Sequence, residues 1–292
     1  MKARRVVITG ISGLVGSHIA RRLEGRCEVI GISRKPGKIS KSILPEAFDI
    51  TDSRALVSFL ERTEFDALIN CAAQADVDRC EIDREEAYKI NTEAVAVMAD
   101  FCKKHKRLLI HLSTDYLFDG QNGPYSEEAS SNPINYYGET KLEAEIAIRS
   151  SGCAYIIVRT NHIYGNLPDG PSRLVRWLLE NSEIKAASDQ YNNSIWAGSL
   201  ADSVIELMEM DFRGVVNIGG PDYLSRYEFA MEGAEVFGID KKRVVKSSIK
   251  KLGLVAPRPL RAGLIIDKMK QILKTAPVSV VDGLKKVRDG AL

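Results

Sequence analysis

The chain has 292 residues, of which 45% are hydrophobic and 27% charged, and its 41 basic and 39 acidic side chains leave a formal net charge of +2. This length and apolar content predict one large or two modest domains around a hydrophobic core. The ordinary charged fraction excludes a wholly disordered chain, and the weak net charge gives no reason to expect nucleic acid or a membrane surface as a partner.

The cysteines and the N-terminus indicate the compartment. The five cysteines are odd in number, and no two have C-x-x-C spacing, so neither a disulfide framework nor a zinc site is predicted. The N-terminal residues lead at once into an apolar strand and lack the features of a signal peptide. No apolar run reaches the ~20 residues of a membrane-spanning helix. We therefore expect a cytoplasmic protein with free thiols and no membrane contact.

Over the first 160 residues, short apolar runs alternate with stretches of helical period. The predicted strands are Arg5–Thr9, Glu28–Ile32, Asp66–Asn70, Arg107–Leu112 and Ala154–Arg159. The predicted helices are Leu14–Leu23, Asp52–Thr63, Arg84–Lys104 and Tyr136–Arg149. This alternation predicts an α/β protein with a doubly wound parallel sheet of the Rossmann type, which binds ligands at the carboxyl ends of its strands.

The pattern changes after about residue 165, where turn-rich segments separate the helical stretches. Helices are predicted near Leu174–Asn181, Leu200–Met210 and Arg226–Phe237, the last opened by a capping box of Ser225 and Glu228. Val215–Ile218 is predicted to be a strand that returns to the main sheet. We expect a first domain over residues 1–165 and a smaller, interleaved region over residues 166–292.

A glycine-rich loop joins the first predicted strand to the first predicted helix. Gly10, Gly13 and Gly16 are spaced as in loops where backbone approaches a pyrophosphate and the next helix offers it free N–H groups. The position between a strand and a helix supports this interpretation, which makes residues 1–165 a dinucleotide-binding domain. The other loop residues expected to contact the cofactor are Ser12, Leu14 and Val15.

The end of the second strand indicates which dinucleotide binds. Sites that prefer NAD usually carry an acidic residue there, whereas this strand ends in Ser33-Arg34. The charged residues that follow before Pro45 are all basic, namely Arg34, Lys35, Lys38 and Lys41. A serine hydroxyl and a guanidinium suit the 2′-phosphate of NADP(H), which we predict as the cofactor. The alternative is a solvated basic loop.

The segment Asp49–Asp52 is a candidate both for contact with the cofactor and for the start of a helix. Asp49 and Ile50 follow a short apolar stretch, and the Asp49 carboxylate is placed to meet the adenine amino group. Asp52 has the same option, but we predict that it caps the next helix.

A tyrosine and a lysine supply the reactive chemistry. Tyr137 and Lys141 are four residues apart and share one face of a helix, so a lysine cation next to the phenol would lower its pKa. The strand end at Ser113–Tyr116 places the Thr114 hydroxyl beside the same site. It could hydrogen-bond the oxygen that Tyr137 protonates.

At this point the sequence resembles the extended short-chain dehydrogenase/reductases and, within them, the dTDP-4-dehydrorhamnose reductase group. The resemblance spans nearly the whole chain. The strings that carry it are the three loop glycines, Asn70–Ala73, Asn91, Ser113–Gly120 and Tyr137–Lys141.

The resemblance implies a role for each matching residue. Tyr137 would give a proton to a sugar carbonyl, and Lys141 would lower the pKa of Tyr137 and hold the nicotinamide ribose. Thr114 would orient the carbonyl. The remaining implied contacts are Ala72 and Ala73 with the cofactor and Asp115 and Tyr116 with the sugar.

The sequence also departs from the family pattern. Asn161-His162 stands where these reductases carry a Ser-Trp pair, which changes the expected sugar pocket, and His162 would bind a substrate hydroxyl or satisfy a local hydrogen bond. The family's asparagine after its Arg-Pro pair is absent. Arg258 and Arg261 remain candidate partners of a diphosphate.

The acid-rich segment Asp76–Glu86 has no convincing metal-ligand spacing, so we predict a solvated loop and a helix N-terminus and no metal site.

The function implied by the resemblance is an NADPH-dependent reduction of a nucleotide-linked 4-keto-6-deoxy sugar. Whether the protein forms a homodimer is left open. Two alternatives remain. One is an NAD-dependent sugar-nucleotide epimerase or dehydratase, and the other is a non-catalytic NADP-binding regulatory subunit.

Overall fold

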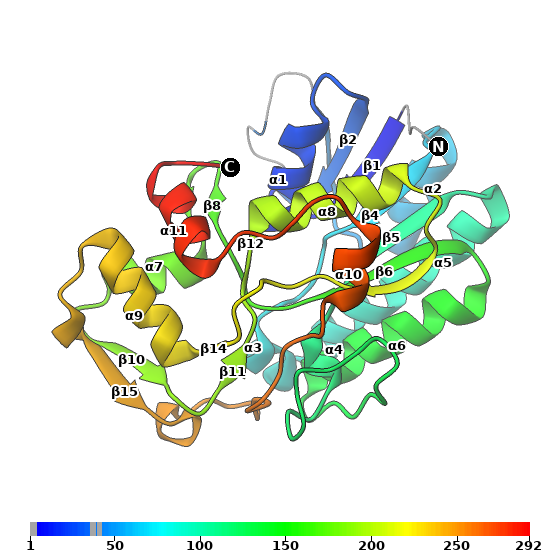
Figure 1. The fold of residues 1–292 in the computed structure, drawn as a ribbon. Coiled ribbons are helices and arrows are strands. Elements are labelled where there is room, and N and C mark those ends of the chain that lie inside the picture. Colours follow the sequence, from blue (N-terminus) through cyan, green and yellow to red (C-terminus); the bar gives the residue numbers. More distant parts are fainter. Residues whose placement is uncertain (1–4, 36–38, 40–42) are drawn as a thin grey trace.

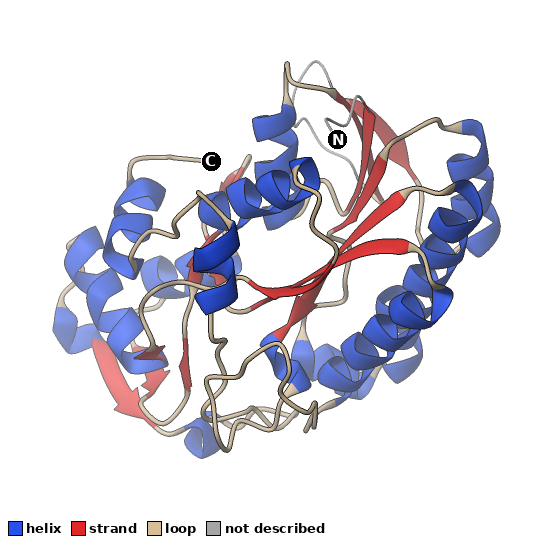
Figure 2. Ribbon diagram, turned by 45° about the vertical axis from the view of Figure 1, so that its right-hand side comes forward, coloured by secondary structure: helices blue, strands red, loops and turns tan. Residues whose placement is uncertain are grey.

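A seven-stranded parallel sheet forms the centre of the protein. The computed structural model describes residues 5–35, 39 and 43–292. The strand order is β13-β6-β5-β4-β1-β2-β3, and every neighbouring pair is parallel. Figure 2 shows the sheet in red with blue helices around it. The strands of this sheet are β1 (Arg5–Thr9), β2 (Glu28–Ser33), β3 (Leu44–Ala47), β4 (Ala67–Asn70), β5 (Leu108–Thr114), β6 (Ala154–Thr160) and β13 (Gly214–Asn217). The order reverses direction at β1, which is the topology of a Rossmann fold.

Helices cover both faces of the sheet (Figure 1). One face carries α1 (Leu14–Leu23) and α8 (Ala197–Glu209), and the other carries α2 (Ser53–Arg62), α5 (Ala94–His105) and α6 (Tyr136–Ser151). Alternate residues of a strand point to opposite faces, and β1 follows this rule. Val6 and Ile8 belong to the hydrophobic core between the sheet and the face that carries α1 and α8. Val7 belongs to the core on the opposite face, and all three side chains are fully buried. This two-sided burial explains why the three central residues of β1 are all apolar.

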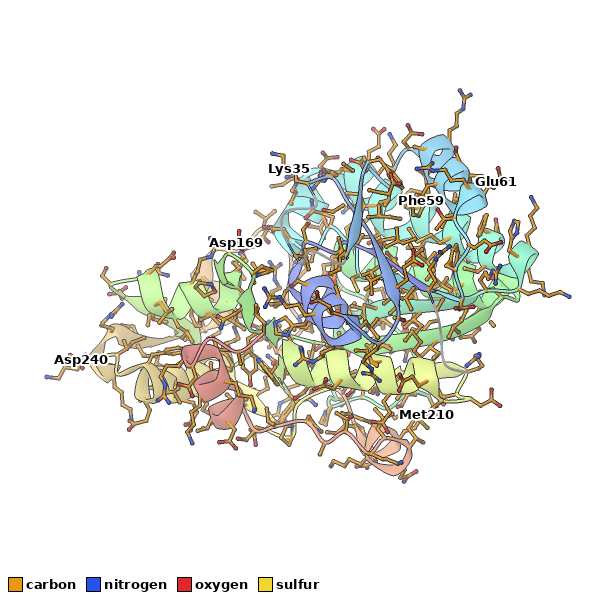
Figure 3. All side chains as sticks on the ribbon, turned by 90° about the horizontal axis from the view of Figure 1, so that it is seen from above. Lys35, Phe59, Glu61, Asp169, Met210 and Asp240 are labelled. Carbon is orange, nitrogen blue, oxygen red and sulfur yellow. The ribbon has the colours of Figure 1, made fainter. Side chains whose placement is uncertain are left out.

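A second lobe lies beside the sheet and has its own core. Its main helices are α7 (Arg173–Glu180), α9 (Arg226–Phe237) and α11 (Val280–Arg288), and β10 (Ile184–Ala187) pairs in parallel with β15 (Val244–Ser247). Tyr164, Phe229 and Leu284 are buried at its centre. In Figure 3, Asp240 of this lobe and Glu61 of α2 lie at opposite ends of the molecule.

The remaining elements are short. The strands are β7 (Ile163–Tyr164), β8 (Asn166–Leu167), β9 (Gly170–Pro171), β11 (Tyr191–Asn192), β12 (Ile195–Trp196) and β14 (Leu224–Ser225). The helical segments are α3 (Val77–Ile82), α4 (Arg84–Tyr88), the π-turn η1 (Lys89–Glu93), the 3₁₀ turns η2 (Asp115–Leu117), η3 (Lys241–Arg243) and η4 (Ile249–Leu252), and α10 (Asp267–Ile272).

The predicted doubly wound sheet is confirmed, and its strands begin and end within two residues of the predicted bounds. The predicted helix Arg84–Lys104 is divided into α4, η1 and α5. Within the first 160 residues, the strand β3 and the helix α3 were not predicted, and neither were the short strands, α10 and α11 of the second part of the chain. β3 contains a proline and a glutamate, which are rare in strands. The proline is tolerated because β3 lies at the edge of the sheet. The division of the chain at residue 165 stays a prediction.

Most of the sheet strands come from the first part of the chain, but the second part also contributes. β13 pairs with β6 at the outer edge, in the register Val216 opposite Val158. The capping box at the start of α9 is present, because Ser225 accepts from the Glu228 N–H and the Glu228 side chain accepts from the Ser225 N–H.

The prediction of a solvated loop over Asp76–Glu86 is wrong for two of its acids. Asp78 Oδ1 accepts from Arg258 Nη2 and from the Ala256 N–H, both at 2.9 Å. Glu81 Oε1 accepts from the Tyr136 N–H at 2.7 Å. These acids join the segment to distant parts of the chain, and such tertiary partners leave no local sequence pattern.

Over residues 5–35, 39 and 43–292, no helix is long and apolar enough to cross a membrane. In the same part of the chain, no group of three His, Cys, Asp or Glu side chains is placed to hold a metal ion.

Candidate active site

The glycine loop is built for the close approach of another chain segment and a ligand. Gly10 has a φ of +65°, and a Cβ there would lie 2.8 Å from the Ala72 nitrogen. A Cβ on Gly16 would collide with the Gly10 carbonyl oxygen. Gly13 is the N-cap of α1 and, lacking a side chain, leaves the first N–H groups of α1 without a side-chain cap. These groups and the helix dipole fit a pyrophosphate.

The end of β2 brings two hydroxyls together. Ser33 Oγ lies 2.6 Å from Ser12 Oγ of the glycine loop, so the sequence-predicted residues Ser12 and Ser33 meet in the structure. Arg34 follows with an exposed side chain. Hydroxyls next to a free guanidinium fit a ribose 2′-phosphate. The predicted basic residues Lys38 and Lys41 lie outside the described residues.

The residues expected around the adenine occupy the loop after β3. Asp49 Oδ1 accepts from the Thr51 N–H at 3.0 Å and from the Thr51 hydroxyl at 2.9 Å, and Ile50 is buried beside it. Asp52 accepts from the N–H groups of Arg54 and Ala55, which confirms that it caps α2. On the other side of the glycine loop, Ala72 lies next to Gly10 and Ala73 is exposed.

Thr114 and Tyr137 meet at the carboxyl edge of the sheet. Thr114 is the last residue of β5, and Tyr137 lies in the first turn of α6, which Asn135 caps through the Gly138 N–H at 2.9 Å. The Thr114 hydroxyl is one of the groups that act on the buried Tyr137 phenol. Burial raises the pKa of Tyr137 above its ordinary value, and the Thr114 hydroxyl lowers it. Tyr137 therefore holds its proton at neutral pH, as an acid must.

Lys141 lies one turn further along α6 and is buried. Its Nζ donates to the Leu112 carbonyl at 2.7 Å and lies 2.9 Å from His111 Nε2. Burial lowers the pKa of Lys141 to about 7, against a smaller opposing effect of Glu145. The Lys141 amino group expected beside Tyr137 is thus in contact with the Leu112 carbonyl and the His111 imidazole of β5.

Asp115 and Tyr116 take different positions at the site. Asp115 is buried and its Oδ2 accepts from the Gly263 N–H at 3.0 Å, so it ties the C-terminal segment to the end of β5. Burial raises the pKa of Asp115 to about 7. The Tyr116 ring meets the Tyr137 ring edge-on, with centroids 5.8 Å apart. Of the two residues predicted to line the sugar pocket, Tyr116 is thus the one in contact with the proposed acid.

The residues predicted to bind the sugar and its diphosphate are distributed around Tyr116. The His162 ring lies 6.4 Å from the Tyr116 ring, and its Nδ1 lies 3.4 Å from Arg226 Nη1. Asn161 is buried and donates to Asn193 Oδ1 at 2.6 Å. Arg258 is held by Asp78 and also donates to the Ala256 carbonyl at 2.8 Å.

A cavity of about 710 Å³ opens next to this cluster. It is bounded by the loop after β5, the segment before β11 and the C-terminal segment around Arg258. Its lining residues are Asp119, Gly120, Gln121, Ile134, Ser188, Asp189, Tyr191, Arg258, Leu260 and Arg261. Two arginines and a tyrosine on one wall suit a nucleoside diphosphate.

Two groups that support this site, His111 and Arg226, were not among the predicted site residues. His111 lies in the predicted strand Arg107–Leu112 but was given no role, and Arg226 was expected only as the start of a helix. One signal was available for His111, because alternate residues of a strand share a face and His111 therefore faces the same way as Ser113. Arg226 approaches His162 from a distant segment, and no pattern in the sequence predicts that contact.

The glycine cradle and the Thr114, Tyr137 and Lys141 cluster meet at one edge of a parallel sheet, and this combination defines the extended short-chain dehydrogenase/reductase class. Within that class, the chain belongs to the RmlD substrate binding domain family, whose sequence profile matches residues 4–291.

Individual relatives agree with this assignment. The chain is 29% identical to the probable low-salt glycan biosynthesis reductase Agl14 of Haloferax volcanii, over 95% of each chain. It is 32% identical to the solved structure of a hypothetical dTDP-4-dehydrorhamnose reductase from Sulfolobus tokodaii, with a TM-score of 0.84 over 96% of this chain and 98% of that one. It is 25% identical to the dTDP-4-dehydrorhamnose reductase of Bacillus anthracis in complex with NADP, with a TM-score of 0.87 over all of both chains.

Proposed function

We propose that this protein is an NADPH-dependent reductase that converts the keto group of a nucleotide-linked 4-keto-6-deoxy sugar to a hydroxyl. The observation that carries the proposal is that Thr114 at the end of β5 and Tyr137 in the first turn of α6 lie at the carboxyl edge of the sheet that also carries the glycine cradle. Relatives named as reductases of this kind support it.

The residues of the chain fit the cofactor. The glycine cradle and the free N–H groups of α1 would hold the pyrophosphate, while Ser12, Ser33 and Arg34 would hold the 2′-phosphate. Asp49 and Ile50 would contact the adenine, and Ala72 and Ala73 would lie against the bound dinucleotide. When bound, the nicotinamide supplies a hydride.

Each reactive side chain then has one task. Tyr137 gives its phenolic proton to the sugar carbonyl oxygen, and the Thr114 hydroxyl holds that oxygen in place. Lys141 holds the nicotinamide ribose. Tyr116 and His162 form the wall beside the sugar, and Arg258 and Arg261 in the cavity wall meet the diphosphate. Asp115 acts indirectly, because it anchors the segment that carries both arginines.

The test is NADPH oxidation by the purified protein, measured against a panel of dTDP-, GDP- and UDP-linked 4-keto sugars. We expect turnover with at least one of them and little with free sugars. An NAD that co-purifies with the protein and no NADPH oxidation would instead indicate an epimerase or dehydratase. No turnover with any substrate, together with a co-purifying protein, would indicate a regulatory subunit.

The same proposal covers location and assembly. A nucleotide-sugar reductase that uses NADPH works in the cytoplasm, and its partner is a small molecule rather than nucleic acid. A homodimer stays a proposal, which light scattering of the purified protein tests.

A further inference from the structure

Four buried polar side chains form a chain of hydrogen bonds behind the proposed site. The Thr9 hydroxyl donates to Asn70 Oδ1 at 2.5 Å, Asn70 Nδ2 lies 3.0 Å from His111 Nδ1, and His111 Nε2 lies 2.9 Å from Lys141 Nζ. All four residues are at most 2% exposed. They come from β1, β4, β5 and α6, so the chain runs from the strand of the glycine loop to the lysine of the site.

One backbone group fixes the orientation of the Asn70 amide. The Ala72 N–H lies 3.3 Å from both Asn70 Oδ1 and Thr9 Oγ1. If the Asn70 amide were turned over, its NH₂ group would face the Ala72 N–H, and two donors would oppose each other in a buried place. The oxygen therefore faces Ala72 and the NH₂ group faces His111.

This orientation decides which nitrogen of His111 carries the proton. A ring nitrogen that accepts from Asn70 Nδ2 has no proton, so Nδ1 is bare and the neutral ring carries its proton on Nε2. That N–H points at Lys141 Nζ. An ammonium has three donors and no lone pair, so only a neutral amine can accept there, while one amine N–H donates to the Leu112 carbonyl.

We propose that His111 is a positioning residue that holds Lys141 as a neutral amine in the protein before cofactor binds. The inference deepens the proposed function, because it concerns the lysine of the same site, and it changes the starting state of that lysine. Lys141 begins as a hydrogen-bond acceptor rather than as the cation that a Tyr-Lys pair implies. It can therefore take up a proton during the reaction cycle.

The charges around the pair agree with this state. Burial lowers the pKa of His111 well below its ordinary value, with Lys141 as a further cause. Burial also lowers the pKa of Lys141. Two groups oppose the second effect, Glu145 on the same helix and the Cys71 thiol after β4. Glu145 is bound to Arg159 and Arg149, which compensate its charge, and burial raises the pKa of Cys71 to about 12, which keeps the thiol neutral.

The experiment uses the full chain without cofactor or sugar, so it is independent of the proposed activity. Nitrogen NMR of ¹⁵N-labelled histidine reports which ring nitrogen is protonated, and the chain has only four histidines. The resonances are assigned with His111→Gln and with His105→Gln, a control at an exposed site. Carbon NMR of labelled lysine, assigned with Lys141→Gln, follows the titration of Nζ.

We expect a bare Nδ1 and a protonated Nε2 on His111, and a Lys141 that titrates far below the other lysines. In His111→Gln the amide oxygen can accept from an ammonium, so the pKa of Lys141 should rise by about one unit, the equivalent of one hydrogen bond. His105→Gln should leave it unchanged. A proton on Nδ1 of His111, or a Lys141 that stays an ammonium alongside the surface lysines, would overturn the proposal. The histidine measurement needs only the unaltered protein, so it decides the question even if His111→Gln does not fold.

Discussion

The guanidinium of Arg159 and the carboxylate of Glu145 form a buried ion pair with two hydrogen bonds. Arg159 Nε donates to Oε1 at 2.9 Å and Nη2 donates to Oε2 at 2.8 Å. The two side chains are 3% and 0% exposed. The pair joins β6 to the middle of α6, the helix that carries Tyr137 and Lys141. It therefore fixes the helix of the site against the sheet.

Replacing Glu145 with alanine should destabilise the protein strongly. The change leaves the Arg159 charge buried without its carboxylate, and breaking a buried pair in this way costs about 3–5 kcal/mol. The free energy of unfolding from urea titrations measures the loss. Arg149→Ala is the matched control, because this arginine binds the same carboxylate but is 44% exposed. That change should cost at most about 1 kcal/mol. Equal losses in the two variants would contradict the expectation.

Replacing Tyr137 with phenylalanine should reduce turnover by at least roughly 100-fold, because the variant lacks the proton donor. NADPH binding, measured by calorimetry, should change little. Tyr136→Phe is the control, since Tyr136 lies in the same turn but its ring packs against Arg84. This control should keep normal turnover. Full activity in Tyr137→Phe would remove Tyr137 as the acid.

Replacing Ser33 with aspartate should weaken NADPH binding by at least about tenfold. A carboxylate there repels the 2′-phosphate and removes one of the two hydroxyls that meet at the end of β2. Binding of NADH should be unchanged or tighter, because a carboxylate can accept from a ribose 2′-hydroxyl. Ser58→Asp places the same charge on the exposed side of α2 and should leave both affinities unchanged. Tighter binding of NADH than NADPH by the unaltered protein would contradict the predicted cofactor.

Asp115 should make the protein less stable as the pH rises from about 4 to 7. Its pKa is raised from 3.8 to about 7 by burial, so the folded protein keeps a proton that the unfolded chain releases. In this interval the group lowers the free energy of unfolding by up to about 1.4 kcal/mol per pH unit. Asp115→Asn cannot titrate, so its stability should depend less on pH. Urea titrations at pH 5 and pH 7 compare the two proteins, and equal slopes would refute the expectation.

The parts of the fold and site that could be predicted are those with local patterns. Gly10, Gly13 and Gly16 lie within one strand–turn–helix unit, and Tyr137 and Lys141 share a helix face because of the helical period. The sheet followed from the alternation of strands and helices, and its edge strand β3 was missed because a proline and a glutamate conceal it.

The supporting contacts could not be predicted, because their partners are far apart along the chain. Asp78 and Arg258 are separated by 180 positions, and Asp115 and Gly263 by 148. The local sequence suggested another role for each acid, a place in a loop or helix N-terminus for Asp78 and a sugar contact for Asp115. The role of a charged side chain is decided by which group the tertiary fold brings to it.

The hydrogen bond from Gly263 to Asp115 has a consequence for synthesis. Arg258, Leu260 and Arg261 belong to the wall of the cavity, yet they lie near the end of the 292-residue chain. The glycine loop and the Tyr-Lys helix leave the ribosome long before them. A nascent or prematurely terminated chain that ends before Arg258 thus contains the glycine loop but lacks one wall of the neighbouring cavity. Such a product also lacks Leu264, Ile266, Met269 and Leu273, which are buried in the core of the main sheet, so it would lose stability together with the cavity wall.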